Sequence, residues 1–190
     1  MNKRVSGTVY VLSVVVAASL AFAATQLKPT KVLLVKSETA KWLVVEKASS
    51  NTVVGDPTAS GAKFGITLTP GGTQCLTLPA SGWSPISTQG FKYKDPQLAN
   101  GPVKVAQIKK TPSGNFKIKV LAKGSGVTVA PGNPTTSYVA SLKITGGGLY
   151  CSTNGTATPK KNDASQYKVV NDTTPGACVS TCSPSGAFID

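Results

Sequence analysis

Histidine is absent from all 190 residues of the sequence. Ser-His-Asp and Cys-His catalysis, histidine-ligated zinc sites and histidine pH switches all require an imidazole, so the sequence excludes them. Acidic residues are also scarce, because only 7 Asp and Glu stand against 20 Lys and Arg, which gives a formal net charge of +13. The composition therefore favours a binding or structural protein over an enzyme.

Arginine is nearly absent too, since Arg4 is the only one in the chain. Arginine reads phosphate and guanine with two parallel hydrogen bonds, whereas lysine is a solvated point charge. A chain whose cations are almost all lysine is therefore not expected to recognise a nucleic-acid sequence.

The few acidic residues show no pattern of a catalytic or metal site. No two are spaced like a glycosidase pair on neighbouring strands, and no loop holds the several acids that calcium needs. Asp56 and Asp95 each precede a proline, which predicts a turn at both positions and a lysine paired with Asp95. We expect no metal and no cofactor.

The N-terminus has the pattern of a signal peptide. Lys3 and Arg4 precede a mostly apolar stretch over residues 9–24, and Ala21-Phe22-Ala23 is a small-x-small cleavage motif. We predict that residues 1–23 are removed and that the protein is secreted or periplasmic. An uncleaved anchor is the alternative, but the stretch is short for a span of about 20 apolar residues. No later run is long enough to cross a membrane.

All four cysteines lie beyond the predicted signal peptide, and an even number in an exported chain predicts two disulfides. A four-thiolate zinc site is the alternative, but it needs two close pairs and only Cys178 and Cys182 are close. Three pairings of Cys75, Cys151, Cys178 and Cys182 are possible. We expect Cys151 to pair with Cys178 or Cys182, because that bridge would fix a polar, loop-rich C-terminal tail from about residue 153 to 190.

Helical periodicity is almost absent from the mature chain, which shows short strand-like runs between Gly, Pro, Asn and Ser clusters. This pattern predicts an all-β fold, an antiparallel β-sandwich of immunoglobulin-like or jelly-roll-like type, with residues 24–190 as one domain. Residues 68–75 and 144–151 both read as strand, glycine turn and strand with a cysteine, which predicts two hairpins of similar construction. The predicted strands are residues 31–36, 41–46, 64–69, 74–78, 90–94, 103–110, 115–122, 127–130, 138–145, 149–152 and 166–170.

Residues 90–123 show the clearest alternation of apolar and charged side chains. Phe91 and Tyr93, Val103 and Val105, and Phe116, Ile118 and Val120 are predicted to share one face of a sheet, with a hairpin around residues 112–115. The intervening lysines then form the opposite face, which would attract anions such as lipopolysaccharide phosphates, acidic polysaccharide or extracellular DNA bound through its backbone. These lysines are Lys92, Lys94, Lys104, Lys117 and Lys119. The alternative is that they only keep an exposed sheet soluble and protect its edges.

Two further features could carry chemistry. Ser60-Gly61-Ala62-Lys63 has the spacing of a serine hydrolase with a lysine base, but it lies in a glycine-rich turn and lacks the accompanying motifs. Trp42 lies in an apolar run and is expected in the core. Trp83, between Gly82 and Ser84, is predicted to lie in a loop and is the better candidate for an exposed ring that stacks on a sugar.

Four strings, CLTLPASGW at residues 75–83, GFKYKD at 90–95, GPVK at 101–104 and YC at 150–151, carry a resemblance. They are similar to a family of uncharacterised exported bacterial proteins with an LPAxxW…GxKYKD…GPVK block and a late YC. The resemblance covers roughly residues 63–182. It implies export, a β-rich fold and no catalytic activity.

The sequence therefore predicts an exported, non-enzymatic structural or interaction module of the bacterial envelope or extracellular space. The alternative is a module that binds anionic glycans or other carbohydrates through the lysine-rich face, with anionic polysaccharide or lipopolysaccharide as the expected partner. A lysine-dependent serine hydrolase is the third hypothesis.

Overall fold

The computed structural model describes residues 25–47, 52–87, 89–173, 176–177 and 182, which form two packed β-sheets. The five-stranded sheet contains β1 (Thr25–Leu27), β11 (Leu149–Thr153), β10 (Ser137–Ile144), β4 (Ala62–Thr69) and β5 (Gly72–Leu78), in that spatial order. The eight-stranded sheet contains β12 (Lys161–Asp163), β13 (Gln166–Asp172), β2 (Thr30–Lys36), β3 (Thr39–Lys47), β9 (Asn115–Lys123), β8 (Val103–Lys110), β7 (Gly90–Lys94) and β6 (Trp83–Ser87). A short helix α1 (Pro57–Ser60) and a 3₁₀ turn η1 (Ala80–Gly82) complete the described elements.

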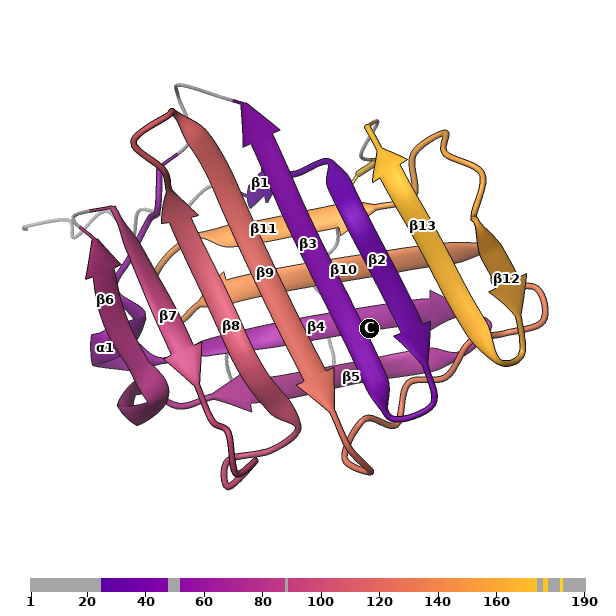
Figure 1. Ribbon diagram of the computed structural model, residues 1–190, viewed down its shortest axis with the longest axis horizontal. Coiled ribbons are helices and arrows are strands. Elements are labelled where there is room, and N and C mark those ends of the chain that lie inside the picture. The colour runs from indigo at the N-terminus through magenta and orange to yellow at the C-terminus, as the bar shows by residue number, and fades with distance from the viewer. Residues whose placement is uncertain (1–24, 48–51, 88, 174–175, 178–181, 183–190) are drawn as a thin grey trace, which may run out of the picture.

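The two sheets lie face to face, and their strands cross in projection, with the eight-stranded sheet nearer the viewer in Figure 1. Neighbouring strands are antiparallel except β1 and β11, which run parallel. The predicted single-domain antiparallel β-sandwich is therefore confirmed. The predicted signal peptide lies outside the described residues.

Each predicted strand is present within two residues of its expected bounds, except residues 127–130. That segment is not a strand, although Val127 and Val129 are buried. The side-chain amide oxygen of Gln74 on β5 accepts hydrogen bonds from the backbone N–H groups of Thr128 and Val129. The segment thus packs beside β5 through a side chain, without a backbone ladder.

Three short strands, β1, β6 and β12, were not predicted. Pro85 in β6 removes a backbone donor, which is tolerated on an edge strand, and β6 is an edge of the large sheet. The segment from residue 153 onward, expected to be rich in loops, contributes both β12 and β13 to that sheet.

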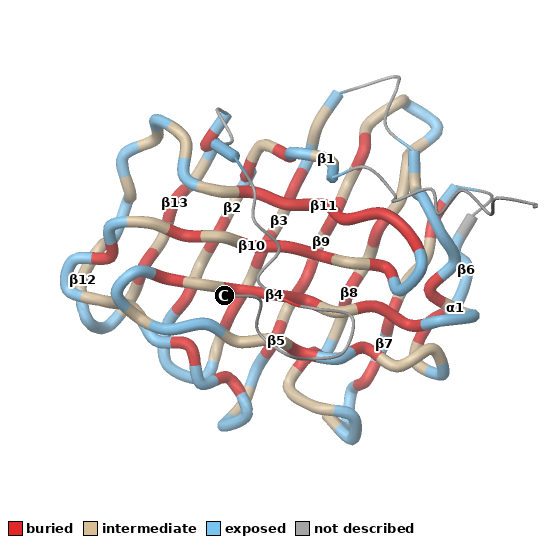
Figure 2. The backbone as a smooth tube through the Cα atoms, turned by 180° about the vertical axis from the view of Figure 1, so that it is seen from behind, coloured by how far each residue is buried: buried red, intermediate tan, exposed pale blue. Residues whose placement is uncertain are grey.

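Aromatic side chains join the two sheets at three places across the core. Trp42 on β3 stacks on Phe64 on β4 with ring centroids 6.2 Å apart, and Phe116 on β9 stacks on Tyr150 on β11 at 5.5 Å. Tyr138 on β10 meets Tyr167 on β13 at 6.2 Å. All these rings are buried. Figure 2 shows buried positions alternating with less buried ones along strands of the large sheet such as β3 and β9, whereas β11 of the small sheet is buried along most of its length.

Hydrogen bonds satisfy the polar atoms of Trp42 and Tyr138 in this core. The Trp42 indole N–H donates to the Ser152 hydroxyl at 3.2 Å, and that hydroxyl donates to the Lys28 carbonyl at 2.7 Å. The Tyr138 hydroxyl donates to the Asp172 carboxylate at 3.0 Å, and burial raises the pKa of Tyr138 far above its usual value. The core therefore leaves few of its buried polar groups unpaired, as a stable interior requires.

The two predicted glycine-turn hairpins lie side by side, because β4 pairs with β10 between β5 and β11. The register places Cys151, Ser141, Gly65 and Cys75 in one row across the sheet. Cys75 is bonded to Cys182, so the predicted Cys151–Cys182 bridge is wrong. Cys151 is also disulfide-bonded, and its predicted partner Cys178 lies outside the described residues. These disulfides rule out the alternative four-thiolate zinc site.

Removing the Cys75–Cys182 bridge should destabilise the fold strongly, since it links residues 107 apart in sequence. Closing a loop of this length stabilises a protein by about 4–5 kcal/mol in the chain-entropy description. We expect the variant Cys75→Ser/Cys182→Ser to unfold at a clearly lower urea concentration than the unaltered protein. With reductant present the two midpoints should converge. Equal midpoints without reductant would show that the bridge contributes nothing.

Truncating Ile118 tests the orientation of β9, because Ile118 is fully buried. Ile118→Ala should cost roughly 2–5 kcal/mol of unfolding free energy. The neighbouring change Lys119→Ala, on the opposite face of the same strand, should change it by no more than about 0.5 kcal/mol. Urea unfolding of both variants measures the difference, and similar losses in the two would contradict the assigned faces.

Candidate anion-binding face

The register of the eight-stranded sheet determines which side chains share its outer face. Residues directly opposite each other on neighbouring strands project to the same side. One row runs Lys168, Leu34, Lys41, Leu121, Val105, Lys94 from β13 to β7. The next row runs Val170, Val32, Leu43, Lys119, Gln107, Lys92. Their sequence neighbours, such as Trp42, Val120 and Tyr93, belong to the core, so both rows face away from it.

Two more rows complete this surface, which faces the viewer in Figure 1. Val45, Lys117 and Lys109 form one, and Lys36, Thr39 and Lys123 form the other. We call the outer face of β13, β2, β3, β9, β8 and β7 the lysine face. Its lysines are Lys36, Lys41, Lys47, Lys92, Lys94, Lys109, Lys117, Lys119, Lys123 and Lys168.

The structure places four of the five predicted lysines on this face: Lys92, Lys94, Lys117 and Lys119. Lys104 is exposed but lies at a β-bulge, where two steps along β8 match one step along β9. The extra residue reverses the alternation. Val103 is therefore buried as predicted, whereas Val105 lies on the lysine face and its predicted place in the core is wrong.

Sequence reasoning missed the lysines of β2, β3 and β13. Lys41 and Lys168 each alternate with buried residues, Ala40 and Trp42 in one case and Tyr167 and Val169 in the other. That local signal was present in the sequence. What it could not show is that β2, β3 and β13 pair beside β9 and extend the same surface.

The six described strands of the lysine face carry no carboxylate on that side, because the two acids within them, Glu46 and Asp172, are bonded elsewhere. Glu46 forms an ion pair with the buried Lys28 at 3.3 Å. Asp172 is buried and accepts hydrogen bonds from Tyr138, Gly155 and Ala157. Asp163 on the edge strand β12 lies opposite Gln166, so it projects to the same side as the lysine face, where it pairs with Lys161, which lowers its pKa strongly. The positive charge of the face is therefore offset only at its margin, beside β12.

Asp95, at the end of β7, organises the loop that follows. Its carboxylate accepts hydrogen bonds from the backbone N–H groups of Asn100 at 2.7 Å and Ala99 at 3.0 Å, and from the Asn100 side-chain amide. These bonds, chiefly that from Asn100, hold the pKa of Asp95 below its ordinary value of 3.8. The predicted turn is confirmed. Its carboxylate is bonded to this loop and forms no ion pair with a described lysine, so the predicted pairing of Asp95 with a lysine is wrong.

The candidate sugar-stacking residue is buried, so the prediction that Trp83 is exposed is wrong. Only 6% of Trp83 is accessible, its ring packs on Tyr93 at 5.6 Å, and its indole N–H donates to the Leu78 carbonyl. The cause is that Trp83 begins strand β6 and pairs with Tyr93 on β7. Trp42 is in the core as predicted. None of the residues in the rows of the lysine face is aromatic.

The lysine face is hollowed at one place, over β2, β3 and β9. The depression has a volume of about 330 Å³ and is lined by aliphatic and cationic side chains together. Leu34 and Leu121 flank Lys41 in the row that runs from Lys168 to Lys94. The remaining lining residues are Lys36, Thr39, Lys119 and Lys123.

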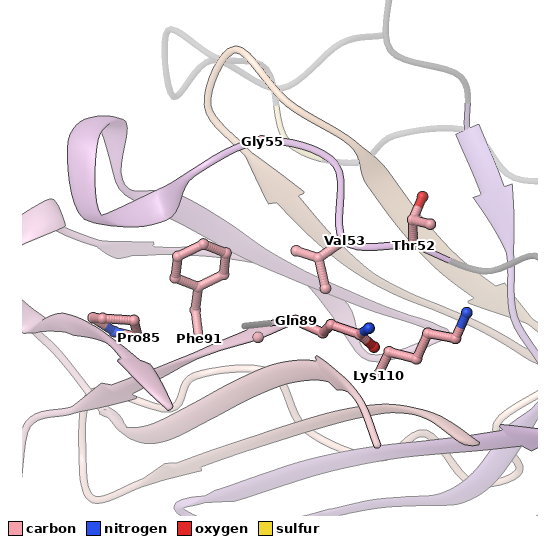
Figure 3. A pocket seen from close by; sticks show the side chains of 8 residues that line it. Thr52, Val53, Gly55, Pro85, Gln89, Phe91 and Lys110 are labelled. Carbon is pink, nitrogen blue, oxygen red and sulfur yellow. The ribbon is translucent and has the colours of Figure 1, made fainter. Parts of the chain in front are cut away.

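A second cavity, of about 400 Å³, lies between the 52–55 loop and strands β6, β7 and β8. Figure 3 shows Phe91, Pro85 and Val53 on its apolar side, and Gln89, Lys110 and Thr52 at its polar end. None of the lysines of the lysine face lines it. It is a separate feature of the molecule.

The remaining chemical candidates have structural roles in the described part of the chain. The Ser60 hydroxyl donates to the carbonyl oxygens of Thr145 at 2.7 Å and Asp56 at 3.2 Å, at the end of α1. The described residues hold no group of three or more His, Cys, Asp or Glu that could bind a metal ion. No described helix has the length and apolar character needed to span a bilayer.

The chain was compared with family models, curated proteins and solved structures, and none of them matches it. The resemblance to an exported bacterial family stays a prediction.

Replacing Asp95 tests its role through pH. An acid whose pKa is lowered by folding stabilises the protein above its unfolded-state pKa, and this stabilisation is lost as pH falls through the folded-state value. Asp95→Ala should therefore lower the melting temperature at pH 7, and the difference from the unaltered protein should shrink below about pH 3.8. Asp95→Asn keeps one acceptor oxygen, so its melting temperature at pH 7 should lie between that of Asp95→Ala and that of the unaltered protein. A pH-independent difference would contradict the role of the ionised form.

Proposed function

We propose that this chain is an exported, non-enzymatic interaction module that binds polyanions through its lysine face. The single observation that carries the proposal is the array of lysines across β13, β2, β3, β9, β8 and β7 with no acid among them on that side. An array of this kind creates a positive potential that attracts anionic polymers. Disulfides in the described part of the chain are consistent with an oxidising extracytoplasmic compartment, which is where an exported protein would be found.

The position of the lysines weighs against a role in edge protection alone. Natural sheets place lysines on edge strands to prevent pairing with other chains. Here many lie on β3 and β9, in the middle of the large sheet, whereas the edge strand β6 has none. Edge protection does not explain this distribution.

The chemistry of the face favours anions over neutral sugars. A lysine ammonium group only donates hydrogen bonds, and phosphate, sulfate and carboxylate oxygens only accept them. Sugar hydroxyl groups need acceptors as well, and carbohydrate sites commonly add an aromatic platform, which the rows of this face lack. Neutral carbohydrate binding, which was tied to an exposed Trp83, therefore loses its structural support.

Binding of dextran sulfate, with neutral dextran as the control ligand, tests the proposal. We expect the purified protein to bind dextran sulfate alone, with an affinity that falls as salt rises, because the attraction is electrostatic. The variant Lys92→Gln/Lys94→Gln/Lys117→Gln/Lys119→Gln should bind at least about 100-fold more weakly, since each lysine at an anionic surface contributes about 1 kcal/mol.

A matched control separates the lysine face from net charge. The variant Lys31→Gln/Lys63→Gln/Lys143→Gln/Lys160→Gln loses the same charge, and none of its positions belongs to the lysine face. It should keep most of the affinity. Equal losses in the two variants would mean that only net charge matters, and no binding at low salt would overturn the proposed function.

A further inference from the structure

We infer that the polyanion bound by the lysine face is the surface of an anionic lipid bilayer; this inference rests on the proposed function and makes it specific. It is carried by aliphatic side chains that share the face with the lysines. Val32, Leu34, Leu43, Val105, Leu121 and Val170 are half-buried there, and Val45 is 41% exposed.

Aliphatic and cationic side chains alternate within single rows. In the row that runs from Lys168 to Lys94, Lys41 lies between Leu34 and Leu121. In the neighbouring row Leu43 lies beside Lys119. A lysine can therefore meet a lipid phosphate while its neighbour contacts the acyl region directly below. Peripheral membrane proteins obtain their affinity from this combination of electrostatic attraction and buried apolar area.

The depression over β2, β3 and β9 shows the same combination on a small scale. Leu34 and Leu121 line it together with lysines on both sides, in a volume of about 330 Å³. An acidic polysaccharide would use the cations and gain little from leucine. A phosphate-bearing lipid would use both, which is why charge and apolarity together favour the bilayer.

The breadth of the face suits a surface better than a single soluble anion. Its lysines extend over six neighbouring strands, from Lys168 on β13 to Lys92 and Lys94 on β7. An array this broad can contact several headgroups at once. The contributions of separate lysines then add, at roughly 1 kcal/mol each close to an anionic membrane, which corresponds to about fivefold per lysine.

Vesicle flotation tests the inference. We expect the protein to float with vesicles of phosphatidylglycerol and phosphatidylcholine in equal parts, and not with phosphatidylcholine alone. The variant Leu34→Thr/Leu43→Thr/Leu121→Thr, which keeps every lysine and uses a residue that favours strands, should bind the anionic vesicles at least tenfold more weakly. Its affinity for dextran sulfate should be unchanged, because it keeps every lysine, and an unchanged circular dichroism spectrum shows that it is folded.

The matched control changes aliphatic residues elsewhere. Leu27→Thr/Val54→Thr alters exposed aliphatic positions outside the lysine face and should leave vesicle binding intact. If the leucine variant binds anionic vesicles as tightly as the unaltered protein does, the aliphatic side chains do not enter the bilayer and the inference is overturned. If the protein binds dextran sulfate but no vesicles, a soluble anionic polymer is the partner and only the proposed function survives. If it binds neither, the proposed function has failed.

Discussion

The aromatic contacts between the two sheets are the constraint on which the rest of the structure depends. Trp42 against Phe64, Phe116 against Tyr150 and Tyr138 against Tyr167 each join one sheet to the other. Because side chains along a strand alternate, a ring turned inward on β3 or β9 forces its neighbours outward. Lys41 and Leu43 flank Trp42, and Lys117 follows Phe116, so the same contacts that build the core also create the lysine face. The described rings lie mostly in the core, so the outer face is left with aliphatic and cationic residues.

The acidic residues strengthen this division of charge. Asp172 bonds Tyr138 and two loop N–H groups, Asp95 bonds the loop after β7, and Asp56 accepts from Thr58 at the start of α1. Each carboxylate satisfies backbone or hydroxyl donors at a loop or element end. A chain with so few acids, used in this way, has none on the outer face of β13, β2, β3, β9, β8 and β7, and Asp163 on the edge strand β12 is already paired with Lys161. The uncompensated charge there follows from how the fold uses its acids.

Local alternation was enough to predict most of the fold, and failed where a local irregularity or a distant pairing decided the outcome. Phe116, Ile118 and Val120 are all buried as expected, because β9 has no bulge. Val105 was misplaced because the bulge beside Lys104 depends on how β8 pairs with β9. Trp83 was misplaced because an edge strand containing Pro85 reads as a loop.

Pairings between segments that are distant in the chain could not be predicted from the sequence. The bond between Cys75 and Cys182 joins an edge strand of the small sheet to the C-terminal region, and four cysteines alone leave three pairings open. The full extent of the lysine face was hidden for the same reason. Lys41 and Lys168 could be predicted to face outward, but only the strand order brings them beside Lys94 and Lys119.

Like charges that face each other within this surface carry a cost for the free protein. Lys109 on β8 lies directly opposite Lys117 on β9. Such cross-strand pairs are destabilising by a few tenths of a kcal/mol each. A sheet that needed only solubility would intersperse both signs of charge, as most protein surfaces do, and would avoid that cost. An anionic partner removes the repulsion and gains the attraction at the same time, so the arrangement that is unfavourable in isolation is the one that favours binding.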